Sequence, residues 1–224
     1  MLFIGLINIL KKIFNMELIY KDIVFSWLND IVEKIKKNKS WEMREYHIAD
    51  IGSYDVGGRN GGSVRNFIES METCICTDCH SNLIKKGGKW NLSDRLSVTG
   101  FDVKINHKDD IEIKSGLIPK EHHTKYDYVT CLGTFNYGDN NQIMEEIISV
   151  SKYDTKILIN LDEKYNKPTS GSPGIHYKKN IKVFGIEGFK EFIKKYPDFE
   201  IYEKPFIRQS YAYFKLIYKG KYDE

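Results

Sequence analysis

The spacing of hydrophobic residues divides the chain into an N-terminal helical part and a longer part in which strands and helices alternate. Apolar residues recur every three or four positions from Val24 to Ile35, which predicts an amphipathic helix packed on a core. Residues 45–52 are typical of a buried strand that stops at a glycine, and a helix is expected to begin near Ser63. The predicted order is strand, glycine-rich loop, helix.

The middle of the chain continues this alternation. Short apolar runs predict strands in 96–105, 109–116 and 126–133, and apolar residues at helical spacing predict a helix over 143–148. The run "TKILINLDE", residues 155–163, is apolar on both sides of the pleat, as buried parallel strands are. Because parallel neighbours need crossover connections, the alternation predicts an α/β fold with helices covering a parallel sheet.

The C-terminal part shows a different pattern. Phe189, Phe192 and Ile193 indicate a helix, and two strands follow in 199–207 and 211–220. The two strands lie so close in sequence that an antiparallel pair is the simplest arrangement.

Charge and length narrow the possible functions. The 224 residues suit one α/β domain with a helical extension. Lys and Arg number 34 against 31 Asp and Glu, a formal charge of only +3, so no nucleic-acid partner is expected. The linker-like stretch "NKPTSGSPG", residues 166–174, is expected to be a loop after the fifth strand.

The first residues, "MLFIGLINILKKIF", carry apolar side chains at helical spacing. The segment is shorter than the ~20 apolar residues that span a bilayer, and its lysines follow the apolar run, unlike those of a signal peptide. Two interpretations stay open for residues 1–15: a helix that docks on the domain or a protein partner, and a peripheral membrane anchor. Nothing marks the chain for export, so a cytoplasmic location with reduced thiols is expected.

Three of the four cysteines stand close together in "CICTDCH". Cys74, Cys76 and Cys79, with His80, offer four ligands for zinc. A single short run rarely surrounds one ion tetrahedrally, so reduced thiols are the preferred interpretation and a zinc site is the alternative.

The stretch "HIADIGSYDVGGRNGG" ends a strand in Asp50 and continues into a glycine-rich loop. Without Cβ atoms, such a loop lets a ligand approach the backbone and the N-terminus of the following helix. The dinucleotide spacing G-x-G-x-x-G fails here, because Tyr54 stands where the second glycine belongs. A second strand ends in "TGFD", and an acid at such a position can accept both hydroxyls of a ribose, so Asp102 is the ribose candidate. The alternative is a surface aspartate that ends a strand.

At this point the chain resembles the class I S-adenosylmethionine-dependent methyltransferases, in particular the methyltransferase type 11 group. The similar segments, in order, are "ADIGSYDVGG", "VTGFD", "KYDYVTCLGTFNY", "KILINL" and "VFGIEGFKEFIKKYPDFEIYE". The resemblance covers Tyr46 to Tyr218. It implies a Rossmann-like three-layer sandwich with a mostly parallel seven-stranded sheet, an antiparallel last strand and N-terminal helices. The implied organisation is a helical extension over 1–45 and a methyltransferase domain over 46–224, with an insertion at about 72–95.

The resemblance also implies a set of residues that bind S-adenosylmethionine. Two positions depart from the family: Lys114 or Ser115 stands where an acid commonly meets the adenine, and Asn136 and Tyr137 replace a frequent Glu-His. The implied contacts are Asp50, Gly52, Ser53 and Tyr54 at the methionine end, Asp102 and Val103 at the ribose and adenine, and Leu132 and Gly133 near the methyl group.

The function implied is methyl transfer to a small-molecule, sugar or lipid-linked acceptor. Where the acceptor needs a base, the candidates are Tyr137, His176 and Tyr177. Two alternatives remain: a non-catalytic protein of this fold that binds a partner as a scaffold, and a nicotinamide-dependent oxidoreductase, which the glycine spacing disfavours.

Overall fold

The computed structural model of the chain contains one mixed β-sheet. The residues it describes are 23–24, 26–28, 46–52, 64, 96–102, 111–112, 118, 122–136, 139–164, 183–208 and 210–220. The strands are β1 (Tyr46–Ile51), β2 (Leu96–Asp102), β3 (Ile111–Glu112), β4 (Tyr126–Cys131), β5 (Ser151–Asp162), β6 (Phe199–Ile201), β7 (Phe206–Arg208) and β8 (Tyr211–Tyr218). The helices are the 3-10 turn η3 (Thr134–Asn136), α4 (Asn140–Val150) and α5 (Gly185–Ile193).

The sheet has the strand order β3-β2-β1-β4-β5-β8-β6. The first five strands of this path run parallel, and β8 is antiparallel to both β5 and β6. The prediction of a mostly parallel sheet with a reversed last strand is therefore confirmed. One more strand, β7, lies outside this path and pairs with β8. Strands β6 and β7 therefore lie along the same edge of β8, and Pro205 stands between them in the sequence.

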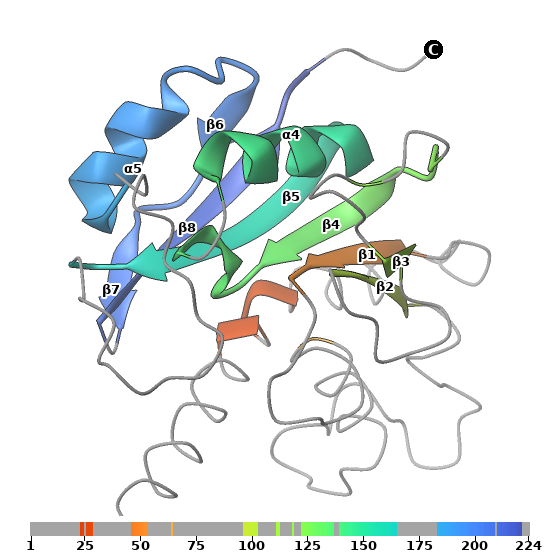
Figure 1. Cartoon of the computed structure of the whole chain (residues 1–224), viewed down its shortest axis with the longest axis horizontal. Coiled ribbons are helices and arrows are strands. Elements are labelled where there is room, and N and C mark those ends of the chain that lie inside the picture. The colour runs from red at the N-terminus through yellow and green to blue at the C-terminus, as the bar shows by residue number, and fades with distance from the viewer. Residues whose placement is uncertain are drawn as a thin grey trace, which may run out of the picture.

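Two hydrophobic clusters lie on opposite faces of the sheet. One contains buried residues of α4 and α5, such as Ile147 and Phe189, and the other contains Val24, Trp27 and Leu28 of the N-terminal helical segment. Figure 1 shows α4 and α5 above the strands and the N-terminal segment below them. The arrangement is a three-layer sandwich, as predicted.

Local sequence explains where the helices begin and how they pack. The Asp139 side chain caps α4 by accepting the N–H of Asn141 at 2.9 Å. The predicted apolar stripe of this helix is buried against the sheet. In α5, Phe189 packs on Phe214 of β8 with ring centroids 4.2 Å apart. Among the described residues, no helix combines the length and hydrophobicity needed to cross a bilayer.

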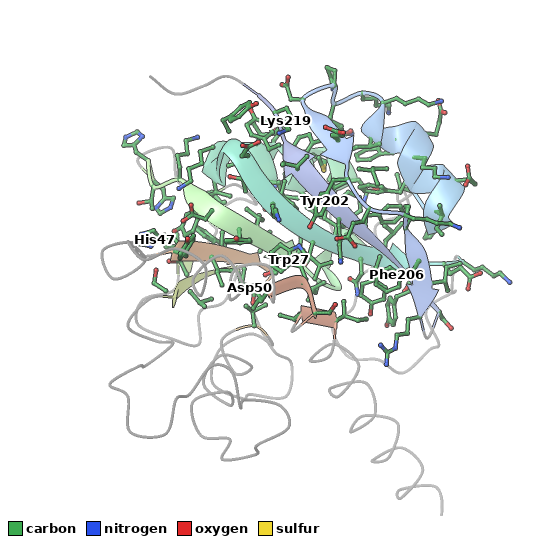
Figure 2. All side chains as sticks on the ribbon, turned by 180° about the vertical axis from the view of Figure 1, so that it is seen from behind. Trp27, His47, Asp50, Tyr202, Phe206 and Lys219 are labelled. Carbon is green, nitrogen blue, oxygen red and sulfur yellow. The ribbon has the colours of Figure 1, made fainter. Side chains whose placement is uncertain are left out.

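Trp27 fastens the N-terminal helical segment to the sheet. The side chain is 2% exposed and meets Tyr128 of β4 edge to face, with ring centroids 5.4 Å apart. Its indole N–H donates to the Tyr202 hydroxyl, which follows β6, at 3.2 Å. Figure 2 shows Trp27 over the strands on this face. The segment therefore spans from the centre of the sheet toward its edge.

We expect Trp27→Ala to lower the free energy of unfolding by ~3–5 kcal/mol, because it removes a large buried ring. Tyr202→Phe, which removes only the hydroxyl that accepts the indole N–H, should cost ~1 kcal/mol. Urea denaturation measures both. A loss below ~1 kcal/mol for Trp27→Ala would mean that the segment does not pack on the sheet in solution.

Candidate functional site

Gly52 forms the turn that ends β1. Its φ of +77° lies in the left-handed region that glycine adopts without strain. A Cβ at this position would lie 1.7 Å from Oγ1 of Thr134, so the space is closed to any side chain. The Gly52 N–H donates to the carbonyl of Phe101 in β2 at 2.7 Å. The carboxyl ends of β1 and β2 are therefore held together at Gly52.

Asp102 lies beside this turn. The parallel register pairs Ile51 with Phe101, and Asp102 is the next residue and the last of β2. Adjacent strands lie ~4.8 Å apart, so the Gly52 turn and the Asp102 backbone are neighbours at one edge of the sheet. The two parts of the nucleoside cradle predicted from the sequence lie together. The ribose contact itself stays a prediction.

Asp50 lies on β1, two residues before the turn, and is 4% exposed. The hydroxyl of Thr130, on the neighbouring β4, donates to Asp50 Oδ1 at 2.6 Å. Thr130 is fully buried. A buried carboxylate needs such donors to offset its loss of hydration, and the bond fixes the orientation of the Asp50 side chain.

The loop after β4 is held from two sides. Thr134 donates its hydroxyl to the Ile51 carbonyl at 3.2 Å, which ties the loop to the end of β1. The Gly133 N–H donates to Oδ1 of Asn160 on β5 at 2.6 Å. Gly133 has φ +77°, and no atom of the described residues lies within 4 Å of where its Cβ would be. The loop therefore has a fixed backbone, and no described residue fills the space in front of Gly133.

The side chain of Asn160 is fully buried, yet its Nδ2 has no hydrogen-bond partner among the described residues. Its cross-strand neighbour is Tyr213 of β8. Burial raises the pKa of Tyr213, and the nearby Asn160 amide partly opposes this, although the two groups do not reach hydrogen-bond geometry. An unpaired buried donor costs ~1–3 kcal/mol, which is unusual in a folded core.

Sequence reasoning missed Thr130, Thr134 and Asn160. A usable signal was present for two of them: Thr130 interrupts the apolar run "YVTCL", and Asn160 interrupts "ILINL". A polar residue inside a strand buried on both faces must find a partner, and that requirement indicates a built site. Thr134 lies in a loop and gives no such signal.

Glu146 of α4 is a buried carboxyl group that the sequence also did not single out. It is 6% exposed. Burial, with a smaller effect from the negative charge of Asp102, raises its pKa to about 7. Burial also raises the pKa of the fully buried Cys131 thiol, which keeps the thiol protonated and unreactive.

Several predicted residues lie outside the described part of the chain. They are Ser53, Tyr54, Val103, Tyr137, His176 and Tyr177, together with Cys74, Cys76, Cys79 and His80 of the proposed zinc alternative. The N-terminal residues 1–15 and the insertion 72–95 also lie outside it. Their roles stay predictions. Within the ranges that the structure describes, no group of three or more His, Cys, Asp or Glu side chains could hold a metal ion.

Known structures share this architecture. The DszA carbon methyltransferase aligns with 91% of this chain and 54% of its own, with a TM-score of 0.58 and 9% identity. The CurJ carbon methyltransferase aligns with 85% and 52%, with a TM-score of 0.52 and 8% identity. A SAM-dependent methyltransferase from Aquifex aeolicus aligns with 83% and 88%, with a TM-score of 0.47 and 13% identity.

The chain therefore has the fold of the class I SAM-dependent methyltransferases. It spans about half the length of the two carbon methyltransferases. No protein-family model and no curated protein matches the sequence.

The described residues fit a nucleoside that carries an amino-acid end. Gly52 lacks the Cβ that would collide with Thr134, Asp102 supplies a carboxylate beside the turn, and no described residue fills the space in front of Gly133. The orphan Nδ2 of Asn160 adds a donor on the β5 side. Each feature lies at or near the carboxyl edge of the parallel strands, where open α/β sheets bind ligands.

The buried carboxyl group of Glu146 predicts a dependence of stability on pH. Its pKa in the folded protein lies above the ordinary 4.5, so the native state retains a proton that the unfolded state releases. Stability is then lost as the pH rises from about 4.5 to about 7. We expect Glu146→Gln to stabilise the protein by ~1–2 kcal/mol at pH 8 and hardly at all at pH 4.

Urea denaturation at the two pH values measures the effect. Glu145→Gln is the matched control, since Glu145 is the preceding residue of α4 and is exposed. A gain that is equal at both pH values would contradict the assignment.

Proposed function

We propose that the protein transfers a methyl group from S-adenosylmethionine to a small-molecule, sugar or lipid-linked acceptor. The observation that carries this proposal is the joint position of the Gly52 turn and Asp102 at the carboxyl edge of parallel β1 and β2. The fold supports it, because matched structures of the same architecture are methyltransferases.

Each residue has a definite task in this proposal. Asp102 accepts the two ribose hydroxyls, and Gly52 makes the tight left-handed turn that holds the end of β1 beside this carboxylate. Asp50, oriented by Thr130, offers negative charge to the ammonium group at the methionine end. Ser53, Tyr54 and Val103 complete the cradle as expected from the sequence.

When bound, S-adenosylmethionine supplies a methyl group on a positively charged sulfur. The chain's contribution is to align the acceptor and to keep water away, since the donor's charge disappears during transfer. Gly133 and Leu132 line the side where the methyl group would lie, and their loop is fixed by the bonds to Ile51 and Asn160. A fixed loop gives the alignment that an in-line displacement requires.

An oxygen or nitrogen acceptor needs a group that removes its proton. The sequence candidates are Tyr137, His176 and Tyr177. Asp162, at the carboxyl end of β5, adds a further candidate among the described residues: burial raises its pKa, which makes the carboxylate a stronger base.

Ligand-induced thermal stabilisation tests the proposal. S-adenosylhomocysteine at a hundred times its dissociation constant should add ~2.7 kcal/mol of stability. For a chain of this size that corresponds to a rise in Tm of ~5–10 °C. Asp102→Ala should abolish the rise, because it removes the ribose acceptor. Asp198→Ala, an exposed aspartate before β6, is the matched control and should retain it.

The same experiment separates the alternatives. A rise in Tm with NADH and none with S-adenosylhomocysteine would favour an oxidoreductase. No rise with either ligand would favour a non-catalytic protein that serves a partner as a scaffold.

A further inference from the structure

Of the two polar atoms of the Asn160 side-chain amide, Oδ1 forms a hydrogen bond and Nδ2 has no partner among the described residues. Its Oδ1 must be the atom that meets Gly133, because the Gly133 N–H donates and only an oxygen can accept. The orientation of the amide is therefore determined, and Nδ2 is the buried atom without a partner. Tyr213, the residue opposite, does not reach hydrogen-bond geometry with it. Within the described part of the chain, Nδ2 is thus a fixed donor that no protein group accepts.

Asn160 and Asp50 lie on the same face of the sheet. The register pairs Asp50 with Thr130, and Thr130 with Leu158, while β4 separates β1 from β5. Residues alternate faces along a strand, so Asn160, two positions after Leu158, shares the face of Asp50. The Cα atoms are then ~10 Å apart across the sheet and ~7 Å apart along it, which gives a separation of ~12 Å.

We propose that Asn160 Nδ2 donates a hydrogen bond to the carboxylate at the amino-acid end of the cofactor; this inference rests on the proposed function. An amino acid presents an ammonium group and a carboxylate ~3 Å apart. Two hydrogen bonds of ~2.9 Å, one at each end, extend this to ~9 Å. Asp50 bonds to Thr130 and Asn160 bonds to Gly133, so both side chains reach toward β4, which lies between them. This inclination can close the remaining ~3 Å.

The chemistry of the two side chains matches the two ends of the amino acid. The carboxylate of Asp50 suits the ammonium group, and the neutral donor of Asn160 suits the carboxylate. Asn160 has two roles in this proposal. Its Oδ1 accepts the Gly133 N–H and so fixes the loop after β4, and its Nδ2 donates to the ligand. An oxygen of the methyl acceptor would offer the same chemistry to Nδ2, so the experiment must distinguish the two sources.

Isothermal titration calorimetry with two probes makes this distinction. S-adenosylhomocysteine carries the amino-acid end, and 5′-methylthioadenosine lacks it. Asn160→Asp keeps an oxygen for the Gly133 N–H but replaces the donor with a negative charge. We expect it to weaken S-adenosylhomocysteine binding by ~10- to 100-fold, the range for a lost hydrogen bond to a charged group, and to leave 5′-methylthioadenosine affinity within twofold.

Two further variants serve as controls. Asn141→Asp makes the same chemical change at an exposed position of α4, where the Asp oxygen can still accept the Tyr196 hydroxyl, and should alter neither affinity. Asn160→Ala removes the donor without adding charge, and it is used if circular dichroism shows that the Asn160→Asp variant does not fold.

The outcomes are separable. Equal effects on both probes, or no effect on either, would overturn the contact with the cofactor carboxylate and leave the proposed function intact. Failure of the unaltered protein to bind either probe would overturn the proposed function and this inference with it.

Discussion

The hydrogen bond from the Gly52 N–H to the Phe101 carbonyl is the constraint on which the site depends. It aligns the ends of β1 and β2, and so sets Asp102 beside the glycine turn. Thr134 fills the space that a side chain at position 52 would occupy and bonds to Ile51. The turn, the loop after β4 and the end of β2 are therefore one interlocked unit, in which a change at one position displaces the others.

The order and direction of most strands could be predicted from the sequence. Continuous apolar runs such as "KILINL" indicate buried parallel strands, and the short separation of the last two strands indicates their antiparallel pairing. The break of one predicted strand, 199–207, into β6 and β7 was not predicted. The chain changes register across 202–205, where Pro205 has no N–H for the ladder.

The sequence predicted the residues of the candidate site only where local backbone geometry determines their position. A glycine after a strand and an acid at the end of its neighbour are local signals, and they identified Gly52 and Asp102. The partnership of Asn160 with Gly133 joins residues 27 positions apart on different elements. Its geometry depends on the register of β4 and β5, which periodicity does not determine. Glu146 is similar, since its position in an amphipathic helix does not reveal which neighbours deprive it of water.

The broken edge formed by β6 and β7 has a consequence for the behaviour of the protein at high concentration. An uninterrupted edge strand offers a row of free backbone groups to a second molecule, and such pairing leads to aggregation. Here each piece has three residues, and the gap between them contains Pro205 and the exposed, charged Glu203 and Lys204. At the opposite margin, the described strand β3 comprises Ile111 and Glu112. Intermolecular sheet extension is thus disfavoured at the margin formed by β6 and β7, which helps to keep separate molecules apart.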